Sequence, residues 1–262
     1  MIRKILLQLC IVLCVFGCES DDSNSINTTQ ASPTFTFSHD WDGTPVSSSD
    51  FNNFIFTNAN GETISIERLR YVISDIIFTA NSGEALSING HNLVDVTNDE
   101  GLSYTLPSTI PIGTFVNVSF TFGLDNEDNS QNLLDLNSAN FNVPDVLGGG
   151  YHYMQFDGEF INSNMEEMGF NYHAIRAVDA SDPDNLVFPE DTFFTVNLGS
   201  IPITSATEIE IKMNIAEWFK NPNLWDLNVY NQMLMPNATA QILMSENGRN
   251  VFSLGEVTQG TE

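Results

Sequence analysis

Short segments of alternating apolar and polar residues recur along this chain, and they constrain its fold more than any other feature. Eight of them are rich in Val, Ile, Phe, Thr and Tyr: 34–38, 71–79, 92–96, 114–122, 150–161, 170–178, 192–198 and 207–215. Alternation places successive side chains on opposite faces of a strand, and branched or aromatic residues suit a pleated surface. Since turn-forming clusters and no long helical pattern separate the segments, the sequence predicts an all-β fold, an antiparallel β-sandwich of the immunoglobulin-like or jelly-roll-like kind.

The C-terminal third departs from this pattern and predicts short helices. Helical turns are expected at 216–220, 227–234 and 238–246. Asn247 and Gly248, just after the last of them, are expected to form a left-handed cap. We expect these helices to cover one end of the sandwich, and Phe252 and Leu254 to complete its core.

The first eighteen residues have the pattern of a bacterial lipoprotein signal peptide. Arg3 and Lys4 precede an apolar run, 5–16, which ends shortly before Cys18. A run of this length is shorter than the ~20 apolar residues of a membrane-spanning helix. We expect residues 1–18 to be the signal and Cys18 to be lipidated. The alternative is an ordinary cleaved signal that happens to contain a cysteine.

The polar run 19–33 is predicted to be a flexible tether that precedes one domain, 34–262. Its acidic residues, Glu19, Asp21 and Asp22, resemble a surface-export signal of some Bacteroidetes lipoproteins, or they belong to a solvated linker. The expected partner is therefore a lipid bilayer, reached through the N-terminal lipid anchor. The expected location is the outer membrane, on its periplasmic or cell-surface side.

Composition excludes several classes of function. The three cysteines all lie within the first 18 residues, so the mature domain has no disulfide and no thiolate metal or catalytic site. With 34 Asp and Glu against 8 Lys and Arg, the chain carries a formal charge of −26. Such a surface repels phosphate backbones, so no nucleic-acid partner is expected. No G-x-S-x-G nucleophile motif occurs, and we expect no enzymatic activity.

The four histidines are the candidate metal ligands, because neutral imidazole is the commonest metal ligand in proteins. They are His39, His91, His152 and His173. Strand alternation places His152 on the face of Met154. If 162–169 is a hairpin loop, His173 faces Gly158, and His152 lies about 20 Å away along the strand. A hairpin alone would then not bring both rings to one ion.

The segments around these histidines resemble the MbnP-like copper-binding family of exported β-sandwich proteins, which are common as lipoproteins in Bacteroidetes. The resemblance rests on GGGYHYMQFDGEF (148–160) and FNYHAIRA (170–177), and on weaker matches at 36–46, 69–84, 91–96 and 113–129. It implies copper binding, for capture, storage or delivery of the ion to a partner protein. His173 falls on the family's F-x-x-H position and is the first candidate ligand.

One branch of the family binds copper through two histidines and a kynurenine made from a tryptophan shortly before the segment 91–96. Residues 86–91 contain no tryptophan, and only Trp41 lies near a histidine in sequence. The expected ligands are therefore histidine with Met154 or a carboxylate.

Two further interpretations remain beside the copper site. The acidic stretch Asp125–Asn129 offers oxygen ligands for calcium, although acidic loops are more often solvated. The alternative function is a surface adhesion or glycan-binding sandwich, in which the histidines only pack.

Overall fold

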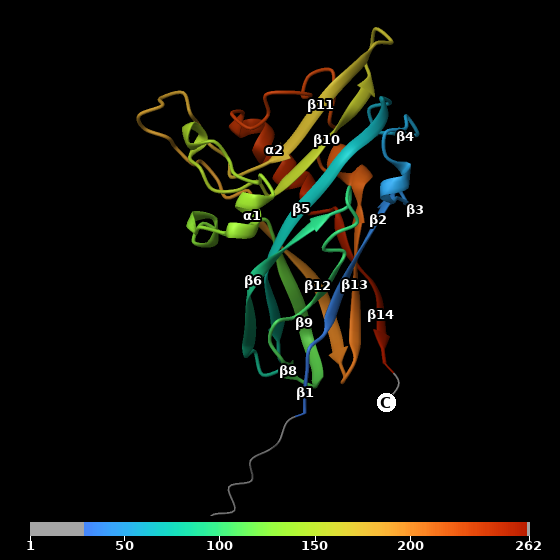
Figure 1. The fold of residues 1–262 in the computed structure, drawn as a ribbon, viewed down its shortest axis with the longest axis vertical. Helices are drawn as coiled ribbons and strands as arrows, with labels where there is room; N and C mark the ends of the chain where they lie inside the picture. Colours follow the sequence, from blue (N-terminus) through green and yellow to red (C-terminus); the bar gives the residue numbers. More distant parts are fainter. Residues whose placement is uncertain (1–28, 261–262) are drawn as a thin grey trace, which may run out of the picture.

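The computed structural model describes residues 29–260, and its architecture is a two-sheet β-sandwich (Figure 1). The strands are β1 Gln30–Ala31, β2 Thr34–Trp41, β3 Thr44–Pro45, β4 Phe56–Thr57, β5 Thr63–Thr79, β6 Ala85–Asp95, β7 Ser103–Thr105, β8 Ile110–Pro111, β9 Gly113–Phe122, β10 Met154–Ile161, β11 Glu167–Ala174, β12 Phe194–Ile203, β13 Thr207–Asn214 and β14 Phe252–Gln259. The helices are α1 Leu134–Ser138, α2 Ala238–Gly248 and the 3-10 turns η1 Ser48–Asp50, η2 Asp128–Ser130, η3 Asp145–Leu147 and η4 Ile215–Phe219.

The strands form two large sheets and one small pair. The larger sheet has the order β11-β10-β5-β9-β12, with β4 and β6 also paired to β5. The smaller sheet has the order β14-β13-β2-β3, with β7 paired to β2, while β1 pairs with β8. All these pairs are antiparallel except β13 with β2. The predicted all-β sandwich is confirmed.

Aromatic side chains join the two sheets face to face. Ring centroids lie 6.4 Å apart for Phe35 of β2 and Phe78 of β5, and 5.5 Å apart for Phe120 of β9 and Phe252 of β14. These positions are the inward-facing members of alternating strands, so the alternation in the sequence accounts directly for the core. The prediction that Phe252 completes the core is confirmed.

The hairpin of β10 and β11 continues the larger sheet beyond the sandwich, because the 17-residue strand β5 is long enough to serve both regions (Figure 1). Tyr172 of β11 packs on Phe219 of η4, with ring centroids 5.4 Å apart. Helix α2 contacts η4 and β11. The helices therefore cover the extended end of the larger sheet, as expected.

Two local predictions in this third of the chain differ from the structure. Only the start of 227–234 forms a helical turn, in which the N–H of Tyr230 donates to the carbonyl of Asp226 and the Asp226 carboxylate accepts from the N–H of Asn228. The rest of this segment is bends and irregular backbone. Asn247 and Gly248 both belong to α2, and neither has a positive φ. A Cβ at Gly248 would lie 2.7 Å from ring atoms of Phe194 and Trp218, so glycine is needed for close packing.

The N-terminal predictions fall mostly on residues that the structure does not describe. The signal peptide 1–18 with Cys18, and most of the predicted tether, lie outside residues 29–260. The end of that tether is part of the fold, because β1 pairs with β8 and Ala31 is buried. None of the helices in residues 29–260 has the length and hydrophobicity needed to span a membrane.

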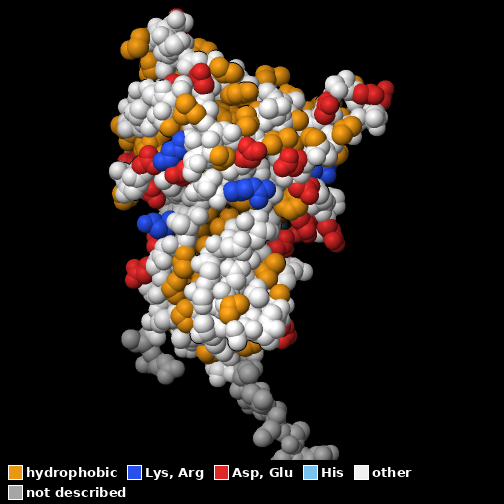
Figure 2. Space-filling model, turned by 180° about the vertical axis from the view of Figure 1, so that it is seen from behind, with side chains coloured by type: hydrophobic (Ala, Val, Ile, Leu, Met, Phe, Trp, Pro, Cys, Tyr) orange, Lys and Arg blue, Asp and Glu red, His pale blue; other side chains and the backbone are white. Residues whose placement is uncertain are grey.

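Charged side chains are unevenly distributed over the surface. Figure 2 shows acidic groups across the upper and middle part of one face, around a few basic groups, while the lower part is largely uncharged. The charged part is the one that carries the β10–β11 extension and its loops.

Candidate functional site

The register of the β10–β11 hairpin determines where His173 lies. Ile161 pairs with Glu167, and Gln155 pairs with His173. The connecting turn is short because the Asn162 carboxamide accepts hydrogen bonds from the backbone N–H groups of Asn164 and Glu166. The predicted register, with Ile161 opposite residue 170, is therefore wrong by three residues. His173 therefore lies opposite Gln155, near the start of β10, and not opposite Gly158.

His152 lies just before β10 and has left the strand alternation. Tyr153 forms a bend, and its N–H donates to the carbonyl of Ala174 at 2.7 Å. The His152 ring consequently joins that of His173, with centroids 5.1 Å apart and planes at 85°. Both the predicted separation of about 20 Å and the placement of His152 on the face of Met154 are wrong.

The His152 ring has one anchored nitrogen and one without a partner. Its Nδ1 lies 2.8 Å from the carbonyl oxygen of Phe141. A carbonyl only accepts, so Nδ1 carries the hydrogen and Nε2 has the lone pair. Within the described residues, Nε2 is buried and has no hydrogen-bond partner. Burial lowers the pKa of His152 to about 4, so the ring is neutral at pH 7.

The His173 ring is held in a similar way by Asp157. His173 Nε2 lies 2.7 Å from Asp157 Oδ1 and donates to it, so Nδ1 is the ring nitrogen left for a ligand. Asp157 also accepts from Asn171 and pairs with Arg68. Burial raises the pKa of Asp157, but the hydrogen bond and charge of His173, the hydrogen bond from Asn171 and the charge of Arg68 outweigh this and bring the pKa to about 2.

The spacing of the two rings fits two ligands of one ion. If each nitrogen lies about 2 Å from the ion, the ring centroids are roughly 4.5 to 6.5 Å apart, depending on the bond angle. The observed 5.1 Å lies within this range. Metal-binding histidines usually donate their second N–H to a carbonyl or carboxylate, as His152 and His173 do. Nowhere in residues 29–260 do three or more His, Cys, Asp or Glu side chains form a group that could hold an ion.

The other two predicted ligands lie apart from this pair. His39 of β2 is buried, with Nε2 3.2 Å from the hydroxyl of Tyr71. His91 of β6 is hydrogen-bonded to Asp135, with Nε2 2.7 Å from Oδ2. The structure therefore brings together two of the four histidines and leaves His39 and His91 in separate surroundings.

The structure also shows where Met154 and Trp41 lie, the other residues considered for the copper site. Gln155 faces His173, so the neighbouring Met154 points to the opposite side of β10, where it is fully buried. Met154 is therefore not a third ligand of this pair. Trp41 stacks on Phe56 at 4.9 Å and donates to a backbone carbonyl, as a core residue does.

The acidic stretch Asp125–Asn129 forms a turn rather than a ligand cage. Asp125 Oδ1 accepts from the backbone N–H of Asp128, and Asn129 Oδ1 accepts from that of Tyr151. Burial, together with the charges of Asp128 and Asp125, raises the pKa of Asp75 to about 6. The described side chains here form no group of three that could hold calcium.

Sequence reasoning missed the groups that orient the two rings. Phe141 acts through its backbone carbonyl, which has no signature in a sequence. Asp157 is one of 34 acidic residues, so its type alone does not mark it, and Arg68 lies on β5, 89 residues away. A correct hairpin register would have placed Asp157 and Asn171 opposite each other and so beside His173.

Fold and site together define an all-β sandwich with a candidate imidazole site at one edge of its larger sheet. The chain belongs to the MbnP family, whose sequence model matches residues 30–237. It is similar in structure to MbnP from Methylosinus trichosporium, with a TM-score of 0.54 and 11% identity, over 87% of this chain and 99% of that one. At this identity the similarity establishes a shared fold. No curated protein sequence matches.

Proposed function

We propose that this protein is an exported lipoprotein that binds copper as cargo through His152 and His173. The observation that carries the proposal is the buried His152 Nε2, which has no partner among the described residues and lies beside a second oriented imidazole. A buried polar atom without a hydrogen bond is costly, and a bound ion is one way to satisfy it. Of the four such atoms among the described residues, His152 Nε2 is the one that belongs to an imidazole beside another imidazole.

Copper suits this pair better than metals that need more ligands. Zinc sites in proteins use three or four protein ligands, whereas Cu(I) is stable with two or three. Imidazole suits copper, and a neutral ring is the form that binds it. The chain belongs to the MbnP family, and its histidine segments resemble those of copper-binding members. Both observations support copper as the ion.

The role we propose is capture, storage or delivery of the ion, without enzymatic activity. Cys18 would carry the lipid that anchors the domain to the outer membrane, on its periplasmic or cell-surface side. A second protein would receive or supply the copper. The signal-like pattern of residues 1–18 supports the anchor.

Copper analysis of purified variants tests the site. The wild type, His152→Ala, His173→Ala and the control His91→Ala would be loaded with Cu(I), desalted and measured by elemental analysis. We expect the first two variants to lose the retained copper and His91→Ala to keep it, since His91 is paired with Asp135 elsewhere. Equal retention by the wild type and both site variants would contradict the proposal.

A further inference from the structure

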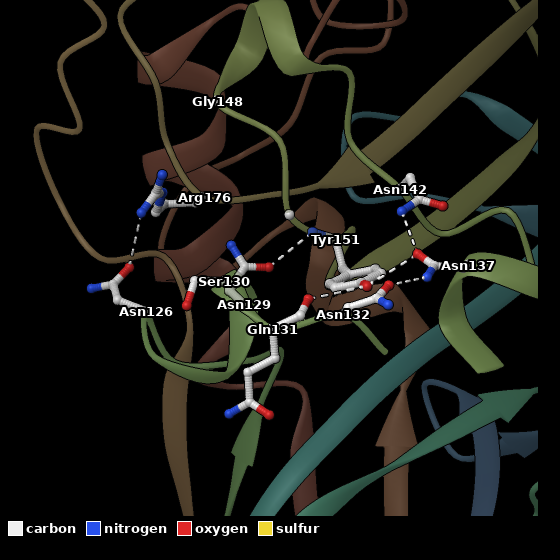
Figure 3. A pocket seen from close by; sticks show the side chains of 11 residues that line it. Asn126, Asn129, Ser130, Gln131, Asn132, Asn137, Asn142, Gly148, Tyr151 and Arg176 are labelled. Atoms are coloured by element: carbon white, nitrogen blue, oxygen red, sulfur yellow. Dashed lines mark hydrogen bonds between the residues drawn. The ribbon is translucent and has the colours of Figure 1, made fainter. Parts of the chain in front are cut away.

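A hollow of about 410 Å³ lies between the loop after β9, helix α1 and the segment after β11 (Figure 3). Its polar lining consists mainly of carboxamides, together with Ser130, Tyr151 and Arg176. Among the described residues that line it, none is Asp or Glu, although the chain has 34 such residues. The hollow is therefore a local exception to the acidic character of the protein.

Three of the carboxamides are held in a hydrogen-bonded chain. Asn142 Nδ2 donates to Asn137 Oδ1, and Asn137 Nδ2 donates to Asn132 Oδ1, each at 2.7 Å. The Tyr151 hydroxyl also donates to Asn137 Oδ1, at 3.1 Å. These hydrogen bonds use one polar atom each of Asn132 and Asn142. The other atoms, the donor Asn132 Nδ2 and the acceptor Asn142 Oδ1, have no partner in residues 29–260. A ligand hydroxyl can both accept and donate, and so matches either atom.

Arg176 brings a positive charge to the other side of the hollow (Figure 3). Its guanidinium lies 3.4 Å from the ring centroid of Phe188, and its Nη1 reaches Asn126 Oδ1 at 3.4 Å. Among the ion pairs of the described residues, none includes Arg176. Gly148, with φ +93°, permits this stack, because a Cβ there would lie 2.6 Å from the Phe188 ring.

We propose that this hollow binds a small hydroxyl-rich carboxylate, of the uronic acid type. Arg176 would pair with the carboxylate, since guanidinium matches it in a bidentate geometry. The oriented amides of Asn132 and Asn142 would hydrogen-bond the hydroxyls. Specific small-molecule sites generally combine such a concave shape with a few fixed polar groups.

An adjacent hollow would favour one orientation of the bound ligand. It contains Asp75, Asp125 and Asp128 and shares Gln131 with the amide-lined one. Its carboxylates repel a ligand carboxylate, whereas Arg176 attracts it. The ligand would therefore bind with its acidic end at Arg176 and its hydroxyls towards Asn137.

Titration with D-glucuronate, followed by NMR chemical shifts, tests this site, with D-glucose as the neutral probe. We expect glucuronate to bind and glucose to bind at least about tenfold more weakly, because glucose has no carboxylate for Arg176. Arg176→Gln should weaken glucuronate binding by about tenfold or more. Arg249→Gln is the matched control, since Arg249 also lies over an aromatic ring, Phe194, but outside the hollow.

Asn142→Asp provides a second, independent arm. It keeps the size of the side chain but places a carboxylate in the hollow, so it should weaken glucuronate binding and leave the weak binding of glucose nearly unchanged. Failure of the wild type to bind glucuronate, equal binding of glucose, or wild-type affinity in both Arg176→Gln and Asn142→Asp would each overturn the proposal. Copper retention, measured on the same samples, is independent of this site.

Discussion

Two buried histidines of this protein have the same altered acidity but different neighbours. Burial lowers the pKa of both His39 and His152 to about 4. His39 lies in the aromatic interior between the sheets, where its Nε2 contacts the hydroxyl of Tyr71. His152 lies at the start of the β10–β11 extension, where its Nε2 has no partner in residues 29–260 and a second imidazole is adjacent.

The difference shows that burial and a low pKa do not by themselves mark a ligand. A neutral ring becomes a candidate ligand when one nitrogen is anchored, the other is free, and a second donor is within reach. In the interior of the sandwich, Tyr71 supplies both a hydroxyl to His39 Nε2 and a ring that packs against the imidazole. The extension leaves His152 open, and this contrast leads to the following predictions.

The largest effect is expected in the aromatic interior. Tyr71→Ala removes a fully buried ring that packs against Phe37, Phe122 and Phe252, and it leaves His39 without its partner. We expect a loss of about 4 kcal/mol in the free energy of unfolding. Urea denaturation measures it, with Tyr71→Phe as the control that removes only the hydroxyl. A loss below about 1 kcal/mol for Tyr71→Ala would show that this interior is loosely packed.

The pH dependence of stability should reveal both histidines. Their pKa is lower in the folded chain than the usual value of 6.5, so between pH 6.5 and 4 the unfolded chain binds protons that the folded chain does not. Their stabilising contribution is complete above pH 6.5 and is lost as the pH falls towards 4, by about 2 to 3 kcal/mol for each ring.

Single substitutions assign this pH dependence to each ring. His39→Gln and His152→Gln should each reduce the difference between denaturation free energies measured at pH 7 and pH 4.5, because glutamine does not titrate. If either variant retains the full wild-type pH dependence, the lowered pKa assigned to that histidine is contradicted.

Asp157→Ala should have a smaller effect, confined to the extension. The substitution removes the acceptor of His173 and Asn171 and the partner of Arg68, whose side chain is 42% exposed. Since Arg68 can regain water, we expect a loss of about 2 kcal/mol rather than the larger cost of a fully buried charge. Asp157→Asn keeps an acceptor for His173 and should lose less. Equal losses in the two variants would mean that only the charge matters.

The smallest effect, a gain, is expected at Asp75. Its raised pKa of about 6 means that ionisation is unfavourable in the folded chain, so stability is lost as the pH rises from about 4 to 6. Asp75→Asn should stabilise the protein at pH 7 by about 1 kcal/mol or less, since the half-buried site is screened by solvent. Asparagine also tolerates the φ of +49° at this position. Thermal unfolding at pH 7 and pH 4 would test the gain, which should vanish at pH 4.

The sequence predicted the strands better than it predicted their pairing. Alternation is a local property, so β2, β9 and β13 appear close to where the pattern places them. Hairpin register instead depends on side-chain hydrogen bonds in the turn, here those of Asn162. For the same reason the four candidate histidines were identified, but not which two of them meet.

The bend at Tyr153 shows a second limit. Alternation assumes a continuous strand, and the bend turns His152 to the side of His173. His152 is held by the backbone carbonyl of Phe141, and a backbone carbonyl is present in every residue type, so the sequence gives no sign of it. Sites assembled from main-chain groups and broken strands therefore become visible only in three dimensions.

X-ray absorption at the copper edge, on the Cu(I)-loaded protein, tests the central claim most directly. The account predicts imidazole scattering from two rings in the wild type and in His39→Gln, and from at most one ring in His173→Ala. Sulfur scattering from methionine, or a spectrum unchanged by His173→Ala, would contradict it.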